Sequence, residues 1–274
     1  MKLVDTHTHL SFKSYDNDRE AVIKKLQKEG VVCIEVGTCY TTSQEAVKLA
    51  QRYKNIFASI GLHPLNIKTD LLKMKRDEEE KIRYIEEGFN GEIYKNLIKY
   101  SSKVVAIGEI GLDYYYRPKT KVKLEGFKRK QKEVFLEQLK VAQTLSLPVI
   151  LHCRLAHKEM IEILKKETQI RGVIHCFSGT LQEMKDYLKL GLYIGFNGII
   201  FKLPLDESIK ECPLEKLLVE TDCPYLSPPQ KDNQRNEPSF VKYVVEKIAK
   251  LKGLGFDQLA QITTQNAIHL FGLS

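Results

Sequence analysis

Histidines and two acids recur directly after short apolar runs in this sequence. The set comprises His7, His9, His63, Glu109, His152, His175 and Asp222. Imidazole and carboxylate ligands together suit Zn, Mn or Fe, whereas carboxylate and water alone favour Mg. Because these groups exceed the four ligands of one tetrahedral ion, the set predicts two divalent cations with Glu109 placed to bridge them.

A single histidine of this kind is more often a hydrogen-bonded core or surface residue than a ligand. We apply that interpretation to His157, as a polar residue that opens a helix, and to His269, which lies far from the set. Glu109 and Asp222 follow apolar residues, and burying an acid there is unfavourable unless a cation or a hydrogen-bond network compensates it. A structural salt bridge is the alternative, but metal coordination explains the joint placement better.

Eight short β-branched runs alternate with helix-like segments. The runs are Leu3–Asp5, Val31–Gly37, Ile56–Gly61, Val104–Gly108, Pro148–His152, Gly172–Cys176, Leu192–Phe196 and Leu217–Thr221. Near-continuous apolar strands are typical of parallel sheets buried on both faces, and their alternation with helices implies right-handed β-α-β units. Eight units predict an α/β fold, a TIM (β/α)8 barrel, in which the candidate ligands stand at the catalytic carboxyl ends of the strands.

Segments between these runs carry apolar residues at spacings of three and four, which predicts the outer helices. They are Asp18–Glu29, Ser43–Tyr53, Lys130–Ser146, Ala156–Thr168, Leu181–Leu190 and Pro238–Leu251. The stretch 68–103 is longer than one helix needs and is charged around Asp77–Lys81, so we interpret it as a largely solvated excursion. We expect one domain over residues 1–274.

The composition, 43% hydrophobic and 28% charged, indicates a soluble globular chain. No run approaches the roughly 20 apolar residues of a bilayer span, and no signal-peptide core follows the first residues, so we expect a cytoplasmic protein with reduced cysteines and no membrane contact. The net charge is +8, and Arg117–Lys132 holds eight basic residues against one acid. With Tyr114, Tyr115 and Tyr116 just before it, this run suits nucleic-acid phosphates and bases, although a solvated helix face is the alternative.

Seven motifs in one order give the sequence a resemblance to the TatD family of metal-dependent deoxyribonucleases, within the amidohydrolase-like TIM barrels. The motifs are Val4–Leu10, Gly61–Pro64, Ile107–Tyr114, His152–Arg154, His175–Gly179, Glu220–Leu226 and Arg235–Pro238. The resemblance runs nearly end to end. It implies a barrel of the metal-dependent hydrolase type with two divalent cations, Mg, Mn or Zn.

The resemblance also assigns ligands and substrate contacts. One ion would be held by His7, His9 and Asp222, the other by His152 and His175, with Glu109 between them. The family's histidine that contacts the substrate phosphate corresponds to His63, and Asp113 and Arg154 stand near it. Departures from the family pattern, namely the long 68–103 stretch and the basic run, concern substrate access rather than metal binding.

The activity we expect is hydrolysis of DNA, from the 3′ end of single strands, by a monomeric deoxyribonuclease. Glu109 and Asp222 are its catalytic carboxylates, and Asp222 is the expected acceptor of the attacking water's proton. The alternative is an amidohydrolase or esterase on a small molecule or an acyl-tRNA, because the same barrel and ligands can serve those reactions. A catalytically idle metal- or nucleic-acid-binding module ranks last, since no ligand position is missing.

Overall fold

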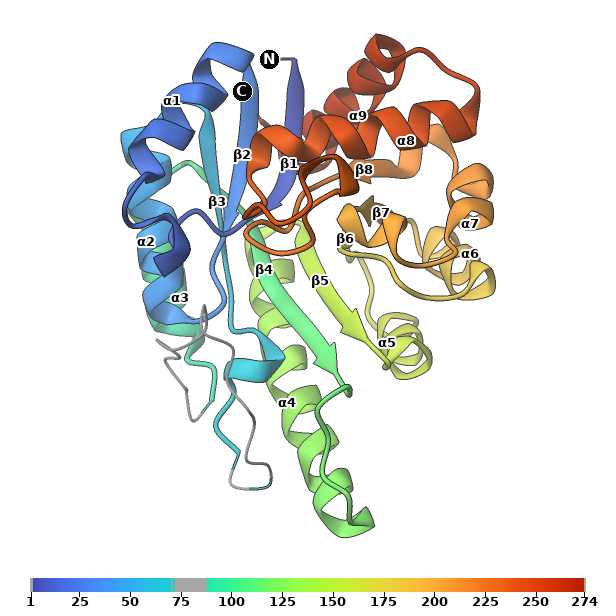
Figure 1. Cartoon of the computed structure of the whole chain (residues 1–274). Helices are drawn as coiled ribbons and strands as arrows, with labels where there is room; N and C mark the ends of the chain where they lie inside the picture. The colour runs from blue at the N-terminus through green and yellow to red at the C-terminus, as the bar shows by residue number, and fades with distance from the viewer. Residues whose placement is uncertain (1, 70, 72–87, 274) are drawn as a thin grey trace.

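Eight parallel strands, paired in sequence order, form the centre of the molecule (Figure 1). The structure is a computed structural model that describes residues 2–69, 71 and 88–273. The strands are β1 (Leu3–Thr8), β2 (Val31–Val36), β3 (Ile56–Ile60), β4 (Val104–Asp113), β5 (Val149–Arg154), β6 (Gly172–Ile174), β7 (Tyr193–Phe196) and β8 (Leu217–Val219). A parallel bridge between Thr8 and Cys223 joins β1 to the segment after β8, so the barrel is nearly closed. The predicted TIM barrel is confirmed.

Helices surround the strands. They are α1 (Arg19–Glu29), α2 (Tyr40–Arg52), α3 (Gly91–Lys99), α4 (Lys121–Leu145), α5 (His157–Leu164), α6 (Leu181–Lys189), α7 (Asp206–Glu211), α8 (Val241–Lys252) and α9 (Phe256–Phe271). Each of the six predicted helical segments contains one of them, while α3, α7 and α9 were not predicted. Among the described residues, no helix has both the length and the apolar character that crossing a membrane requires.

Helix α4 begins at Lys121 rather than at the predicted Lys130, so the basic run forms its first half. Its buried face includes Phe127, Gln131, Val134, Phe135 and Gln138. The two glutamines interrupt the apolar spacing, which hides the pattern in the sequence. Gln138 Oε1 accepts from the backbone N–H of Leu62 at 2.7 Å, and Nε2 donates to its carbonyl at 3.0 Å. The helix is thereby tied to the segment that follows β3.

The expected excursion at 68–103 is only partly within the described structure. Its acidic centre, 77–81, lies outside the described residues. Gly91–Lys99 forms α3, in which Tyr94 and Leu97 are buried. The ring of Tyr94 meets that of Tyr40 in α2 at 5.6 Å between centroids. This part of the range therefore belongs to the helical ring rather than to a solvated excursion.

The barrel interior is apolar towards the amino ends of the strands, where α9 covers it (Figure 1). One cluster joins the strand residues Val4, Val32, Ile34, Val36, Phe57, Val105, Ile150, Val173 and Leu218 with Ala267, Leu270, Phe271 and Leu273. Neighbours in sequence such as Val31 and Cys33 point outwards, into a second cluster with the helices. With its amino end filled, the barrel leaves polar side chains to its carboxyl end.

Candidate metal centre and active site

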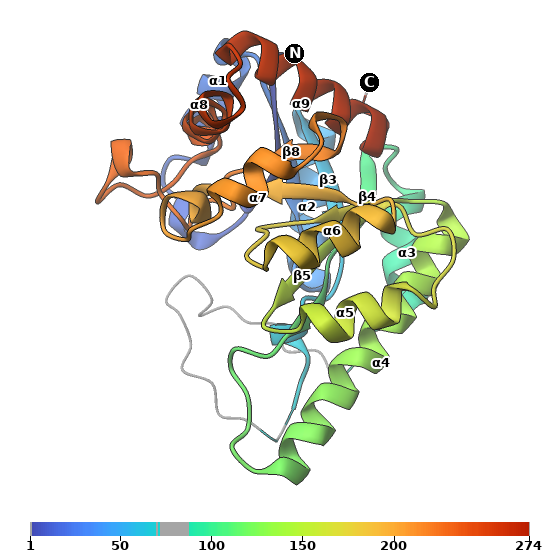
Figure 2. The ribbon, with the colours of Figure 1, turned by 90° about the vertical axis from the view of Figure 1, so that its right-hand side faces the viewer.

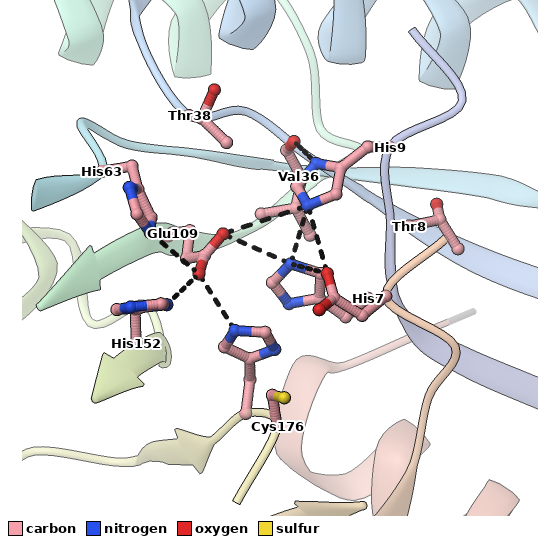
Figure 3. A network of polar contacts seen from close by, with 12 residues as sticks. His7, Thr8, His9, Val36, Thr38, His63, Glu109, His152 and Cys176 are labelled. Carbon is pink, nitrogen blue, oxygen red and sulfur yellow. Dashed lines mark hydrogen bonds and ion pairs between the residues drawn. The ribbon is translucent and has the colours of Figure 1, made fainter. Parts of the chain in front are cut away.

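All seven predicted groups lie together at the carboxyl end of the barrel, arranged around Glu109 (Figure 3). They come from the ends of β1, β4 and β5 and from the segments that follow β3, β6 and β8. His157 and His269 lie outside the centre. His157 opens α5 with Nδ1 at 3.0 Å from the hydroxyl of Tyr187, and His269 is exposed on α9.

One group of ligand atoms gathers on the β1 side of Glu109. His7 Nε2 and His9 Nε2 are 3.1 Å apart, and Asp222 Oδ1 is 3.8 Å and 3.6 Å from them. Glu109 Oε2 lies 3.4 Å from His7 Nε2 and 4.0 Å from His9 Nε2. In a tetrahedral site with bonds of about 2.0–2.2 Å, ligand atoms are about 3.3–3.6 Å apart. These four atoms therefore have the spacing of one metal's ligands.

A second group surrounds the other oxygen of the same carboxylate. Glu109 Oε1 is 2.7 Å from His152 Nδ1, 2.9 Å from His175 Nε2 and 3.4 Å from His63 Nε2. The rings of His7 and His175 stack at 3.9 Å between centroids, so the two groups adjoin. Glu109 is the one side chain that contacts both groups.

The second ring nitrogen of three histidines contacts an acceptor that points it away from the centre. His9 Nδ1 lies 2.9 Å from the carbonyl of Val36, His152 Nε2 lies 3.0 Å from Asp113 Oδ2, and His175 Nδ1 lies 3.3 Å from Glu220 Oε1. Each contact places the ring proton on the outer nitrogen, which leaves a lone pair directed inwards. Ligand histidines in metal sites are held in this way. The residues thus fit divalent cations.

Irregular strand pairing aims the ligands inwards. The register of β1 against β2 shifts within Asp5–Thr8, and that of β4 against β5 shifts within Ile107–Ile110. Each shift includes a candidate ligand, His7 in β1 and Glu109 in β4. Extra residues of this kind re-aim side chains and are common beside active sites. Strict alternation, from which we expected His7 and His9 to point the same way, is therefore not what places them.

The end of β4 is held from both sides. Gly111 has φ 147° and lies so close to β5 that a Cβ would come within 2.0 Å of the carbonyl oxygen of His152. On the helix side, the N–H of Asp113 donates to Gln131 Oε1 at 2.9 Å. The Asp113 carboxylate then accepts from Arg154 Nε at 2.7 Å as well as from His152. Burial would raise the pKa of Asp113, but the contacts with His152 and Arg154 lower it to about 2.

Buried charges at the centre compensate one another. Burial would raise the pKa of Glu109, but the neighbouring His63 and His175 outweigh it and hold that pKa well below its usual value. Burial likewise opposes ionisation of Asp222, yet its hydrogen bond to His9 and the charge of His175 keep its pKa low. Both carboxylates are therefore ionised at neutral pH, which favours a cation between them.

His63 has a different character from the ligand histidines. Burial lowers the pKa of its imidazole to about 4. Its Nδ1 accepts from the backbone N–H of Leu65 at 3.1 Å and so caps the short 3-10 turn Pro64–Asn66. A neutral ring with Nδ1 occupied carries its proton on Nε2, which faces the centre.

Three buried acids that the sequence analysis did not select support the ligands. Glu220 Oε1 accepts from the N–H of Cys176 at 2.6 Å, next to His175. Asp5 Oδ1 accepts from the backbone of His7 at 3.2 Å, and Glu35 accepts from the N–H groups of the two residues after His9 at 2.8 and 2.7 Å. Each acid stands between β-branched residues, and that was the available signal.

A cavity of about 740 Å³ opens over the centre. Its lining includes His9, His63, Glu109, His152, Asp222 and Arg154. At its rim, Arg154 lies over the rings of Tyr115 and Tyr116, at 4.5 Å and 5.3 Å from their centroids. All nine predicted site residues are thus brought to one cavity or its wall. The arrangement can bind cations, activate water and hold an anion.

Comparison with known proteins gives one consistent family. The sequence model of the TatD related DNase family matches residues 4–272. The metal-dependent hydrolase YabD of Bacillus subtilis is 38% identical over 278 residues, covering 99% of this chain and 100% of that protein. The 3′-5′ ssDNA/RNA exonuclease TatD of Citrobacter rodentium is 33% identical over 283 residues, covering 99% and 98%.

A solved structure agrees with the sequence matches. The TatD homologue YjjV of Escherichia coli superimposes with a TM-score of 0.83 at 30% identity, over 100% of this chain and 99% of that one. The likeness covers the whole barrel, including the strand ends that carry the metal centre.

Proposed function

The chain belongs to the family of TatD related DNases, metal-dependent hydrolases, and we propose that it removes nucleotides from the 3′ end of single-stranded DNA. The observation that carries this proposal is the convergence of four histidines and two ionised carboxylates beside Arg154 in one cavity. The name of the Citrobacter relative supports the polarity and the single-stranded substrate. Phosphodiester hydrolysis is the reaction that this centre suits best.

We propose two divalent cations, Mg, Mn or Zn. One would be held by His7, His9, Asp222 and Glu109 Oε2, and the other by Glu109 Oε1, His152 and His175. Bound cations supply Lewis-acid stabilisation of phosphate charge and a water of lowered pKa. Glu109 has the bridging position because each of its oxygens faces one ligand group.

Asp222 is the proposed proton acceptor. Its side chain is 15% exposed against 5% for Glu109, so it is the carboxylate that reaches into the cavity. Its low pKa keeps it ionised at neutral pH, ready to take a proton from an attacking water. Glu109, enclosed by histidines, orients ligands instead.

His63 and Arg154 are the proposed contacts to the substrate phosphate. The neutral His63 can donate from Nε2 to a phosphate oxygen. Arg154 is anchored through Nε on Asp113, which leaves the end of its guanidinium for the anion. Two donors for an anion at the mouth favour a phosphodiester over the amide or ester of the alternative interpretation.

We further propose that the chain acts as a monomer in the cytoplasm. Six free cysteines fit a reducing compartment. Light scattering at enzyme concentrations tests the first point.

The decisive experiment is metal add-back to chelator-stripped protein, with a 5′-labelled single-stranded oligodeoxynucleotide analysed on a sequencing gel. Mg, Mn and Zn are added separately. A metal-dependent ladder that shortens from the 3′ end is expected. Two bound ions per chain without cleavage by any metal would contradict the proposal and direct the search to amides and esters.

A further inference from the structure

We propose that exposed cations around the start of α4 hold the phosphates of the DNA strand outside the cavity, on the 5′ side of the nucleotide being removed. We call this surface the basic ridge; it consists of Arg117, Lys119, Lys121, Lys123 and Arg129. The inference rests on the proposed function and adds the path of the strand. It assigns a role to the part of the basic run that the metal centre does not use.

The charge of the molecule is concentrated here. Arg117–Lys132 has eight basic residues against one acid, a net charge of +7, whereas the whole chain carries +8. All five residues of the basic ridge are exposed. Within the described part of the chain, Arg129 alone among them has an acidic partner, Glu133 at 4.0 Å. Cations that lack acidic partners suit a polyanion, because binding releases its condensed counterions.

The inner lysines of the same run differ from the basic ridge. Lys128 lies over the ring of Tyr114 at 4.6 Å, and it lines a separate cavity with Lys132, Glu159 and Glu162. Acids of α5 thus face this side of α4. The charge left for a partner is on the outer side.

The basic ridge continues from the mouth of the active site. Tyr116 lines the cavity, and Arg117 is the next residue along the chain. Tyr115 and Tyr116 are 55% and 40% exposed, and Arg154 packs over both rings. A strand that leaves the cavity meets these stacking surfaces first and the cations next, the combination that single-strand binders use.

The shape of the molecule gives the basic ridge its reach. Figures 1 and 2 show the first half of α4 projecting beyond the carboxyl ends of β4 and β5. The helical stretch 121–132 is about 17 Å long at about 1.5 Å per residue. It can therefore contact several phosphates of one strand, but it lies beyond a short oligonucleotide held in the cavity.

The test compares two triple variants with the same loss of charge. The ridge variant carries Lys119→Gln, Lys121→Gln and Lys123→Gln. The control carries Lys28→Gln, Lys54→Gln and Lys140→Gln, three exposed lysines away from the mouth. Fluorescence anisotropy measures binding of phosphorothioate strands of about 4 and about 16 nucleotides to the metal-loaded protein, at about 50 and about 200 mM salt.

The ridge variant should bind the long strand at least about tenfold more weakly and the short strand less than about twofold more weakly. The slope of log affinity against log salt should fall by about 0.7 for each phosphate contact removed, about 2 for three contacts. Equal losses in the two variants, or equal losses on the two strands, would overturn the inference. If ridge-dependent binding occurs without any cleavage of ordinary DNA, the basic ridge stands and the proposed nuclease activity is wrong.

Discussion

The two ends of the barrel use the same eight strands for opposite purposes. At the amino end, α9 closes an apolar interior with Leu270 and Phe271. At the carboxyl end, Glu109 is 4% exposed and is surrounded by imidazoles instead of apolar side chains. Buried ionisable groups need compensation, whereas apolar packing needs none. The comparison teaches that stability is concentrated at the amino end and chemistry at the mouth.

The largest effect should come from Asp222→Asn at the mouth. Asp222 has φ 57°, a conformation that Asn tolerates, so the variant keeps the backbone while it loses the proton acceptor. We expect turnover to fall roughly 10²–10⁴-fold with the fold intact. Steady-state kinetics, thermal unfolding and the bound metal per chain are measured together. Near wild-type turnover would show that another group accepts the proton.

Phe271→Ala tests the other end. Phe271 is 4% exposed in the cluster that fills the barrel, so its removal should lower the free energy of unfolding by about 3–5 kcal/mol. Turnover per folded molecule should not change. Phe256→Ala, on the same helix but 38% exposed, is the matched control and should have an effect of about 1 kcal/mol or less. Denaturant titration measures both, and a loss of turnover by the folded variant would break the comparison.

Glu220→Gln asks how far the mouth depends on residues that do not face the cavity. Glu220 is fully buried and accepts from the backbone of Cys176 beside His175. A weaker acceptor at His175 Nδ1 should lower metal affinity about 10–100-fold. Competition with a chromogenic chelator measures it, with the exposed Glu246→Gln as control. Unchanged affinity in both variants would limit the centre to the ligands themselves.

The sequence predicted the barrel because its strands are continuous apolar runs, and it predicted the ligands because they follow those runs. Boundaries were less accurate where polar residues occupy core positions. Gln131 and Gln138 bind backbone groups of other segments, so α4 was expected nine residues too late. Such a contact depends on a partner far away in the chain, which local spacing does not contain.

The same reason explains what was missed around the site. Glu35 and Asp5 bind backbone N–H groups in and around the loop that carries His9, and their role is visible only once β1 and β2 are paired. The register shifts that aim His7 and Glu109 arise from pairing as well. Residue type and order identified the centre, whereas its hydrogen-bonded support required the fold.

The smallest effect concerns His63, where the mouth should lower stability in acid. Burial lowers its pKa from about 6.5 in the unfolded chain to about 4. Between these values the unfolded chain binds a proton that the folded chain does not, so the free energy of unfolding falls as the pH falls, by about 1.4 kcal/mol per pH unit. This contribution is complete above pH of about 6.5 and is lost towards about 4.

His63→Asn should remove that slope while keeping the turn, because Asn also caps the N–H of Leu65. Denaturant titrations of chelator-treated wild type and variant across this pH range give the difference, in which the titrations of other groups cancel. His269→Asn, on exposed α9, controls for the loss of an imidazole. Parallel curves for wild type and His63→Asn would mean that His63 is protonated inside the folded mouth, and its proposed role as a neutral donor to phosphate would then be wrong.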